Sequence, residues 1–289
     1  MKKKKQPIFN IYIVLMLIFF YLPIIYTIFF SFNETKSLAH FCGFSLRWYE
    51  KMFADRTMME AIWYTFIIAI IATVVSTIVG TITAIGLSKS KRIVQNIVEQ
   101  INNLPIMNPE IVTAVGLLML FASIKGIEKG FVTLLLAHIM FCIPYVIFSV
   151  TPKLRTLDPN LTEAAMDLGA TPWQALTKVI VPQIMPGIVS GALIAFTMSF
   201  DDFVISYFVT GNGVNNISTL VWTMSKRINP SINALSTIII VIITIGLILA
   251  NVVPLLKDKK EKNTSWNFAM SWAAPMWLWP PQPCCLFIN

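Results

Sequence analysis

The sequence predicts an all-α membrane protein with six transmembrane helices, and its composition and the placement of its charges are the main reasons. Of 289 residues, 56% are hydrophobic and only 12% are charged, and the mean hydropathy is +0.72. Soluble domains carry about 25% charged residues, so this chain lacks the polar surface that a water-soluble core of its size requires. Its Lys and Arg residues gather at the ends of long apolar runs, which is typical of membrane helices.

Six apolar runs are each long enough to cross a bilayer, which takes about 20 helical residues. They are Ile8–Phe32, Ala61–Leu87, Ile93–Ile124, Phe131–Thr151, Gln183–Val209 and Ala234–Leu256. The first follows the basic segment Met1–Lys5 and is too long for the hydrophobic region of a cleaved signal peptide. The third is too long for one straight crossing and is interrupted at Pro105 and Pro109, so we expect a bent or broken helix there.

The basic residues predict that both termini lie in the cytoplasm. With that orientation most of the 22 Lys and Arg residues fall on the cytoplasmic side, as the positive-inside rule requires. The eight that fall outside are Lys36, Arg47, Lys51, Arg56, Lys125, Lys129, Lys226 and Arg227. We therefore expect a multi-pass protein of the plasma or inner membrane, in contact with lipid. The net charge of +8 follows from this topology and does not indicate a nucleic-acid partner.

Small residues at helical spacing predict where the membrane helices meet. The stripe on the fifth run consists of Gly187, Gly191, Ala195, Ser199, Asp202 and Ser206. The second run repeats the pattern with Ala72, Ser76, Gly80 and Ala84. Glycine and alanine allow another backbone to approach closely, and the polar members supply hydrogen bonds between helices.

The charged segment 152–182, between the fourth and fifth runs, predicts two short helices joined by a glycine turn. Asp158 is a good N-cap and Pro159 a good first helical residue. Gly169 would end that helix in the left-handed conformation. Thr171, followed three residues later by a glutamine, predicts a capping box that starts the second helix.

The first of these helices has the features of a docking element. Its small and apolar side chains share one face: Leu161, Ala164, Ala165 and Leu168. Glu163 and Asp167 lie four residues apart, where like charges repel unless a cationic partner covers them. A DNA-binding helix-turn-helix is excluded because this helix is acidic. An ordinary amphipathic loop lying on the membrane surface is the alternative.

The residues Glu163-Ala164-Ala165, then Gly169, then Val179-Ile180-Val181-Pro182 form a spaced pattern. It resembles the cytoplasmic coupling loop of ABC-importer permeases, in which the ending is I-x-L-P, so valine replaces both Ile and Leu here. Four further segments resemble the second permease subunit of spermidine/putrescine importers: Phe44–Tyr49, Pro109–Val112, Ala137–Pro144 and Phe200–Gly211. The resemblance covers roughly residues 8–260.

The resemblance implies the type I ABC-importer permease fold and a set of partners. These are a sister permease that forms a heterodimer with this chain, two ATPase subunits and an extracytoplasmic solute-binding protein. The residues expected to couple the chain to the ATPase are Glu163, Ala164, Ala165, Asp167, Gly169 and Pro182. The chain has no G-x-x-x-x-G-K-[ST] motif, so we expect ATP and Mg to be bound and hydrolysed by the ATPase subunits, and neither a cofactor nor a metal by this chain.

Carboxylates inside apolar runs are costly unless they are paired or solvated, so they are candidates for function. The predicted pathway for a cationic solute consists of Asp201, Asp202, Glu110, Ser199 and Ser206. The alternatives are that the aspartates cap a helix, or that they pair with Lys226 or Arg227. His138 is a lone histidine in a span, which is more often hydrogen-bonded to a neighbouring helix than catalytic.

Two classes of function remain open at this point. The first is the permease subunit of an ATP-driven importer for polyamines, or for another small cationic solute or a metal complex. The second is an ion-coupled secondary transporter, which would have no need of an ATPase dock. Residues 1–262 are predicted to form the permease domain. Residues 263–289 are rich in Trp and Pro and are predicted to be an atypical tail outside the fold.

Overall fold

A computed structural model describes residues 7–245, except 38, 125, 127, 212 and 226–228, together with residue 248. All the regular elements in this part of the chain are helices, as the composition predicts. The chain divides into two compact units, one of Met1–Phe32 with Asn233–Asn289 and one of Asn33–Ile232.

The first unit holds the first and last predicted spans. Helix α1, Pro7–Ser31, confirms the first span, and its segment Ile11–Ser31 is long and apolar enough to cross a bilayer. A shorter apolar helix, Ser231–Ile245, starts at the boundary between the units and covers the described part of the predicted span Ala234–Leu256. The rest of that span and the predicted tail 263–289 lie outside the described residues.

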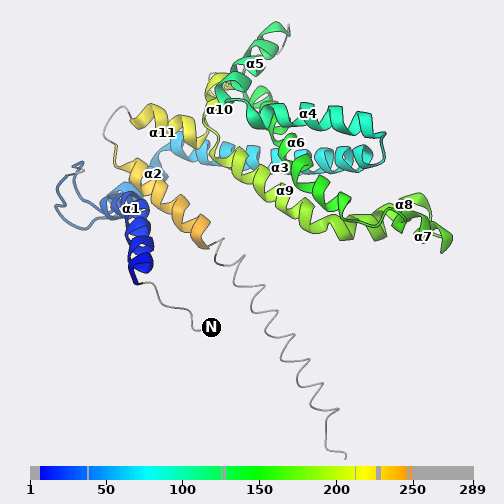
Figure 1. Cartoon of the computed structure of the whole chain (residues 1–289). Helices are drawn as coiled ribbons and strands as arrows, with labels where there is room; N and C mark the ends of the chain where they lie inside the picture. The colour runs from blue at the N-terminus through cyan, green and yellow to red at the C-terminus, as the bar shows by residue number, and fades with distance from the viewer. Residues whose placement is uncertain are drawn as a thin grey trace, which may run out of the picture. The chain divides into compact units, whose positions relative to one another are not determined.

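The second unit is organised around three packed helices, α3 (Arg56–Ser88), α6 (Phe131–Arg155) and α9 (Val181–Asp201). They confirm the second and fourth predicted spans and most of the fifth. The short helices of this unit are α2 (Arg47–Ala54), α7 (Leu161–Asp167), α8 (Pro172–Ala175), α10 (Val204–Val209) and α11 (Ile217–Ser225). Figure 1 shows α7 and α8 at one end of the α3, α6 and α9 bundle, and α10 and α11 at the other.

Small residues let α6 and α9 approach closely, as their spacing predicts. A Cβ added at Gly187 would lie 2.8 Å from Lys153 Cγ and 3.2 Å from the Ser149 carbonyl oxygen. The Ser149 hydroxyl donates to the Gly187 carbonyl at 3.0 Å. The small-residue stripe of the second span is buried on α3: Ala72, Ser76, Gly80 and Ala84.

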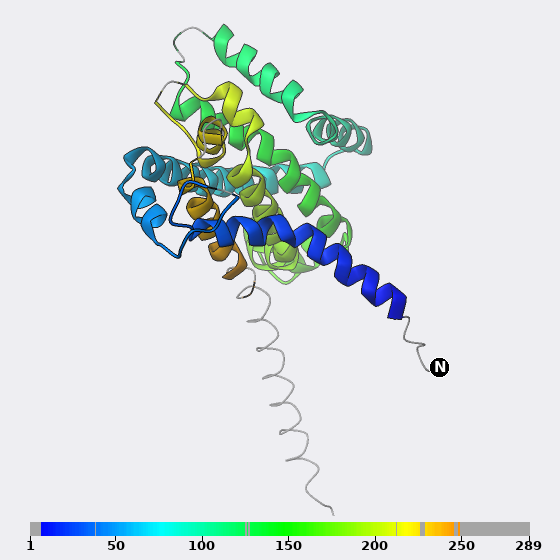
Figure 2. The same cartoon turned by 90° about the vertical axis from the view of Figure 1, so that its left-hand side faces the viewer.

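The third predicted span is broken, as its prolines indicate. Helix α4, Arg92–Met107, and helix α5, Glu110–Ser123, meet at an angle of 105°, and Figures 1 and 2 show this corner from two sides. The break lies at Asn108, whose extended backbone (ψ 146°) suits a residue before proline. The predicted interruption at Pro105 is wrong, since α4 continues through this proline to Met107.

The prediction of one continuous helix over Gln183–Val209 is wrong. Helix α9 ends at Asp201, and α10 begins at Val204. The physical reason is the Asp202 side chain, because its carboxylate accepts the backbone N–H groups of Ile205 at 3.2 Å and of Ser206 at 2.7 Å. An aspartate that accepts these first N–H groups starts a new helix.

The helix that carries the fifth span begins earlier than the predicted span does. Helix α8, a π-helical segment η1 (Leu176–Ile180) and α9 follow one another without a break, so the helix runs over Pro172–Asp201. Pro182 therefore lies inside this helix and does not mark its start. The π-helical segment lies just before this proline, which has no backbone N–H to donate.

Candidate functional site: a docking loop and an acid cavity at opposite ends of the bundle

The loop between α6 and α8 begins with a turn. The predicted N-cap at Asp158 and first helical residue at Pro159 are wrong by two positions, since α7 has Asn160 at its N-cap and begins at Leu161. The Asp158 carboxylate accepts the Asn160 N–H at 2.9 Å, and its carbonyl accepts the Leu161 N–H at 3.2 Å. Pro159 thus occupies the second position of a β-turn, which its ring also favours.

The two remaining local predictions for this loop are confirmed. Gly169 ends α7 with φ +87°. Its N–H donates to the Met166 carbonyl at 2.8 Å, and the Ala170 N–H donates to the Ala165 carbonyl at 3.1 Å, which is the Schellman pattern. Thr171 forms the capping box with its glutamine partner at distances of 3.3 and 3.0 Å. The loop is therefore held in shape by its own hydrogen bonds.

The loop exposes a mixed acidic and apolar surface. Glu163, Ala164 and Asp167 are exposed. Leu168 is 90% exposed and Trp173 is 72% exposed, although both are large apolar side chains. Exposed apolar groups gathered beside carboxylates are typical of a surface that another protein covers. The predicted apolar face of α7 is therefore half-buried at Leu161 and Ala165 and exposed at Ala164 and Leu168 within the described part of the chain.

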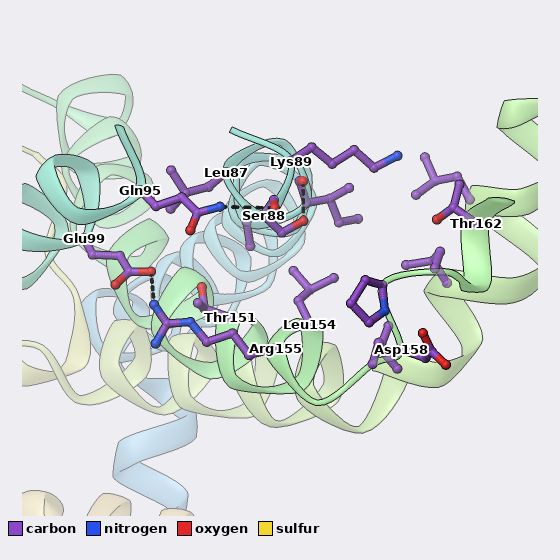
Figure 3. Close-up of a pocket in the computed structure, with 16 residues that line it drawn as sticks. Leu87, Ser88, Lys89, Gln95, Glu99, Thr151, Leu154, Arg155, Asp158 and Thr162 are labelled. Atoms are coloured by element: carbon purple, nitrogen blue, oxygen red, sulfur yellow. Dashed lines mark hydrogen bonds and ion pairs between the residues drawn. The ribbon is translucent and has the colours of Figure 1, made fainter. Parts of the chain in front are cut away.

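A cavity of about 320 Å³ lies beneath the loop. Figure 3 shows Glu99 and Arg155 pointing toward one another on one side of it, and Asp158 and Thr162 on the loop side. Arg155 donates to Glu99 at 2.5 Å, which ties α4 to the end of α6. Gln95 donates to the carbonyls of Ser88 and Ser90 at 3.2 and 2.9 Å, which ties α4 to the end of α3.

A second cavity, of about 270 Å³, lies where the two broken spans meet. Three predicted pathway residues line it, namely Glu110 at the start of α5 and the pair Asp201 and Asp202 at the α9–α10 break. Phe141 and Tyr145 of α6 add aromatic walls. We call it the acid cavity. The structure thus brings together three carboxylates that belong to two separate spans.

The two aspartates of the acid cavity differ in their surroundings. Asp201 is exposed, whereas Asp202 is 9% exposed. The Asp202 carboxylate also accepts the Ser206 hydroxyl at 2.7 Å, in addition to the two backbone N–H groups of α10. Asp202 is therefore a helix cap. The alternative partners Lys226 and Arg227 lie outside the described residues.

Ser199 and Ser206 do not line the acid cavity but belong to a buried network beside it. His138 Nδ1 lies 2.7 Å from Ser199 Oγ, and Nε2 lies 3.0 Å from Ser206 Oγ. This confirms that His138 is hydrogen-bonded to neighbouring helices. Asn216, which the sequence reasoning missed, donates to Ser206 Oγ at 2.7 Å and to the Asp202 carbonyl at 3.0 Å. Its position one residue before a helix start is the sequence signal that could have found it.

No three His, Cys, Asp or Glu side chains of the described residues come close enough together to hold a metal ion. The acid cavity is lined by carboxylates and aromatic rings, inside a helical bundle, at the opposite end from the loop. Such a cavity suits an organic cation, because carboxylates accept N–H donors and aromatic faces attract positive charge.

Comparison with known proteins gives the chain its family. Residues 76–259 match the family described as binding-protein-dependent transport system inner membrane component. The putrescine transport system permease protein PotI of Escherichia coli K12 is 38% identical over 77% of this chain and 82% of that protein. The spermidine/putrescine transport system permease proteins PotC of Haemophilus influenzae and of E. coli K12 are 38% and 34% identical, over 81% and 85% of this chain and 91% and 92% of those proteins.

Solved structures of transporters share the fold. A chain of a bacterial alginate ABC transporter superposes with a TM-score of 0.65 at 16% identity, over 86% of this chain and 93% of that one. A chain of the MetNI methionine ABC transporter superposes with a TM-score of 0.53 at 20% identity, over 66% of this chain and 95% of that one. The chain therefore belongs to the family of inner-membrane components of binding-protein-dependent transport systems, and is a permease subunit of an importer.

Proposed function

We propose that this permease admits polyamines such as putrescine and spermidine, and that the acid cavity lies on their path. The observation that carries the proposal is the gathering of three carboxylates around one cavity in a chain that is 34–38% identical to named polyamine permeases. A polyamine presents several ammonium groups joined by methylene stems. The carboxylates would accept its N–H groups, and the rings of Phe141 and Tyr145 would contact its stems.

The three acidic residues of the acid cavity have different roles in this proposal. Asp202 uses its oxygens to cap α10, so Asp201 and Glu110 are the carboxylates with capacity to accept hydrogen bonds from the solute. The charge of Asp202 still attracts a cation, since the electrostatic interaction of two charges is several times stronger in a protein interior than in water. In this arrangement Asp201 and Glu110 bind the solute. Asp202 contributes negative charge near the cavity and caps α10 at the α9–α10 break.

The loop at the other end would dock on an ATPase subunit. We place Glu163, Ala164, Ala165, Asp167 and Gly169 on the docking helix and its turn, and Pro182 in the helix that would pass the movement to the α9–α10 break. The exposed Leu168 and Trp173 support this role. Both termini would then lie in the cytoplasm. The remaining partners are a sister permease, a second ATPase subunit and an extracytoplasmic binding protein. ATP and Mg would be bound by the ATPase subunits alone.

Uptake of labelled putrescine and spermidine tests the proposal, in cells that lack their own polyamine importers and express this chain with its partners. We expect saturable uptake that stops when the ATPase subunit is inactivated. Asp201→Asn and Glu110→Gln should each lower uptake at subsaturating solute about tenfold or more, because each removes one charge from the cavity. Uptake that survives loss of the ATPase, or variants that transport like wild type, would contradict the proposal.

A different cationic solute is the second candidate, because the acid cavity attracts any small cation. Competition decides between the two. Polyamines should displace other amines and metal complexes from the transporter, and the reverse order would replace polyamines by the better competitor. An ion-coupled secondary transporter is disfavoured by the family to which the chain belongs. Its remaining test is uptake that depends on an ion gradient in the absence of ATP.

A further inference from the structure

A buried polar network beside the acid cavity joins the segments that form the α9–α10 break. It consists of His138 on α6, Ser199 on α9, Ser206 on α10 and Asn216 before α11. These four side chains are 1%, 2%, 0% and 3% exposed, respectively. Polar groups buried this deeply destabilise a protein unless they are hydrogen-bonded. Their contacts must therefore match donor to acceptor throughout.

The donor and acceptor roles in the network can be assigned starting from the Asn216 amide. Its Oδ1 accepts the Thr219 N–H at 2.9 Å, which assigns the other end of the amide, Nδ2, as the donor to Ser206 Oγ. The Asp202 carboxylate can only accept, so the single hydroxyl proton of Ser206 goes to Asp202 Oδ2 at 2.7 Å. Ser206 Oγ therefore has only acceptor capacity left for its third neighbour, His138.

The tautomer of His138 follows from this. Its Nε2 must carry the proton that is donated to Ser206 Oγ at 3.0 Å, and its Nδ1 accepts the Ser199 hydroxyl at 2.7 Å. One neutral tautomer satisfies every donor and acceptor in the network. The ring thereby connects the last part of α9 to α10 across the break, and the chain of hydrogen bonds ends on the Asp202 carboxylate.

We propose that His138 is a positioning residue for transport. Its neutral ring holds α9 and α10 in one relative orientation and, through Ser206, holds the Asp202 carboxylate against α10, so that Asp201 faces the acid cavity. This inference rests on the proposed function, because it gives His138 a role in the passage that the cavity supplies. Without the ring's two hydrogen bonds, α9 and α10 could adopt several relative orientations. Movement of the loop between α6 and α8 would then transport less solute.

The test is the number of solute molecules imported per ATP hydrolysed by the assembled complex. His138→Phe keeps a flat ring in the place that packs on Phe141, whose centroid is 5.8 Å away, but removes both hydrogen bonds. We expect uptake per complex to fall about tenfold while binding-protein-stimulated ATPase activity stays within about twofold, so solute per ATP falls about fivefold or more. A purely structural role would lower uptake and ATPase activity together, in proportion to the amount of complex.

A matched control lies one turn along the same helix. Cys142 is fully buried on α6 and contacts the Ala195 carbonyl on α9 at 3.4 Å, but it is outside the network. Cys142→Ala should leave solute per ATP at the wild-type value. Ser199→Ala removes only one of the ring's hydrogen bonds and should lower the ratio by a smaller factor in the same direction. If the His138→Phe complex does not assemble, Ser199→Ala alone tests the positioning role of His138.

The double variant His138→Phe/Ser206→Ala sharpens the result. If His138 acts through Ser206, the solute imported per ATP should be no lower in the double variant than in the more impaired of the two single variants. An unchanged ratio in both His138→Phe and Ser199→Ala, or a control as impaired as they are, would overturn the inference. The proposed function would stand in that case if Asp201→Asn still lowered uptake. If the transporter instead imported another cation, the same ratio would be measured with that cation.

Discussion

The loop between α6 and α8, which we propose to dock on an ATPase subunit, and the acid cavity lie at opposite ends of the same bundle, and they are built in different ways. The loop takes its shape from hydrogen bonds between residues a few positions apart, and its surface is exposed. The acid cavity is formed by residues from separate spans, and the network that holds it is buried. In the proposed function, the surface that would meet a partner is preformed locally. The cavity on the proposed solute path depends on contacts between helices, which movement of those helices can alter.

The α6–α9 contact connects the two ends, and breaking it should have the largest effect. Gly187→Val forces a branched side chain against Lys153 Cγ and the Ser149 carbonyl, so the helices must separate. We expect a destabilisation of about 1–3 kcal/mol or more and a large loss of assembled complex. The amount of complex in the membrane and its thermal stability measure this. Gly86→Val is the control, because a Cβ at Gly86 meets nothing within 4 Å. An equally large loss with that variant would contradict the packing argument.

Gly169→Val should change the conformation of the loop between α6 and α8 without disturbing the acid cavity. Its Cβ would meet nothing within 4 Å, so the strain comes from φ +87° alone and amounts to about 1–2 kcal/mol. The docking helix would be re-aimed, and ATPase stimulation by loaded binding protein should fall sharply while the complex still assembles. Gly169→Asn tolerates the left-handed conformation and should keep most of the stimulation. Normal stimulation and uptake with valine would remove the coupling role from this turn.

The two aspartates sharpen the comparison at the cavity end. Asp202→Asn keeps one acceptor oxygen where the carboxylate accepts three hydrogen bonds. It should therefore lower both the amount of complex, through a cost of about 1–3 kcal/mol, and the uptake per complex. Asp201→Asn should lower uptake per complex and leave the amount unchanged, because the Asp201 side chain is exposed. Wild-type uptake per assembled complex in both variants would refute the cation path.

The ion pair beneath the loop should matter little. The side chains of Arg155 and Glu99 are 62% and 26% exposed, and exposed pairs contribute about 0–1 kcal/mol. Arg155→Gln should change stimulated ATPase activity by less than about fivefold, which corresponds to that range. A double-mutant cycle with Glu99→Gln measures the coupling energy of the pair. A much larger coupling energy would show that α4 takes part in transmitting force from the loop.

Deleting residues 263–289 should have the smallest effect. The Lys cluster before the predicted tail is expected to remain as the cytoplasmic anchor of the sixth span. Uptake and the amount of complex should both match those of the full chain. A loss of either in the truncated protein would show that the tail is a working part of the permease.

The sequence by itself determined the class of protein, the positions of the first four spans and the shape of the loop turn. Hydropathy and charge depend on composition over about 20 residues, and the bilayer selects for both, so they can be read along the chain. Gly169 and the Thr171 capping box were equally predictable because each is satisfied within three or four residues. The break at Asp202 has a local cap as well, but the apolar residues around it made a continuous span the simpler prediction.

Tertiary structure alone decided which of the predicted pathway residues lie around one cavity and which do not. Glu110 joins Asp201 and Asp202 only because the third span bends by 105° and brings the start of α5 to the α9–α10 break. Ser199 and Ser206 lie 61 and 68 residues from His138, and no periodic pattern along the chain links them to it. The sequence showed that these groups were polar and within spans. Whether each faces a cavity or another side chain depends on how distant helices pack, because burial leaves each polar group only the partners that packing brings to it.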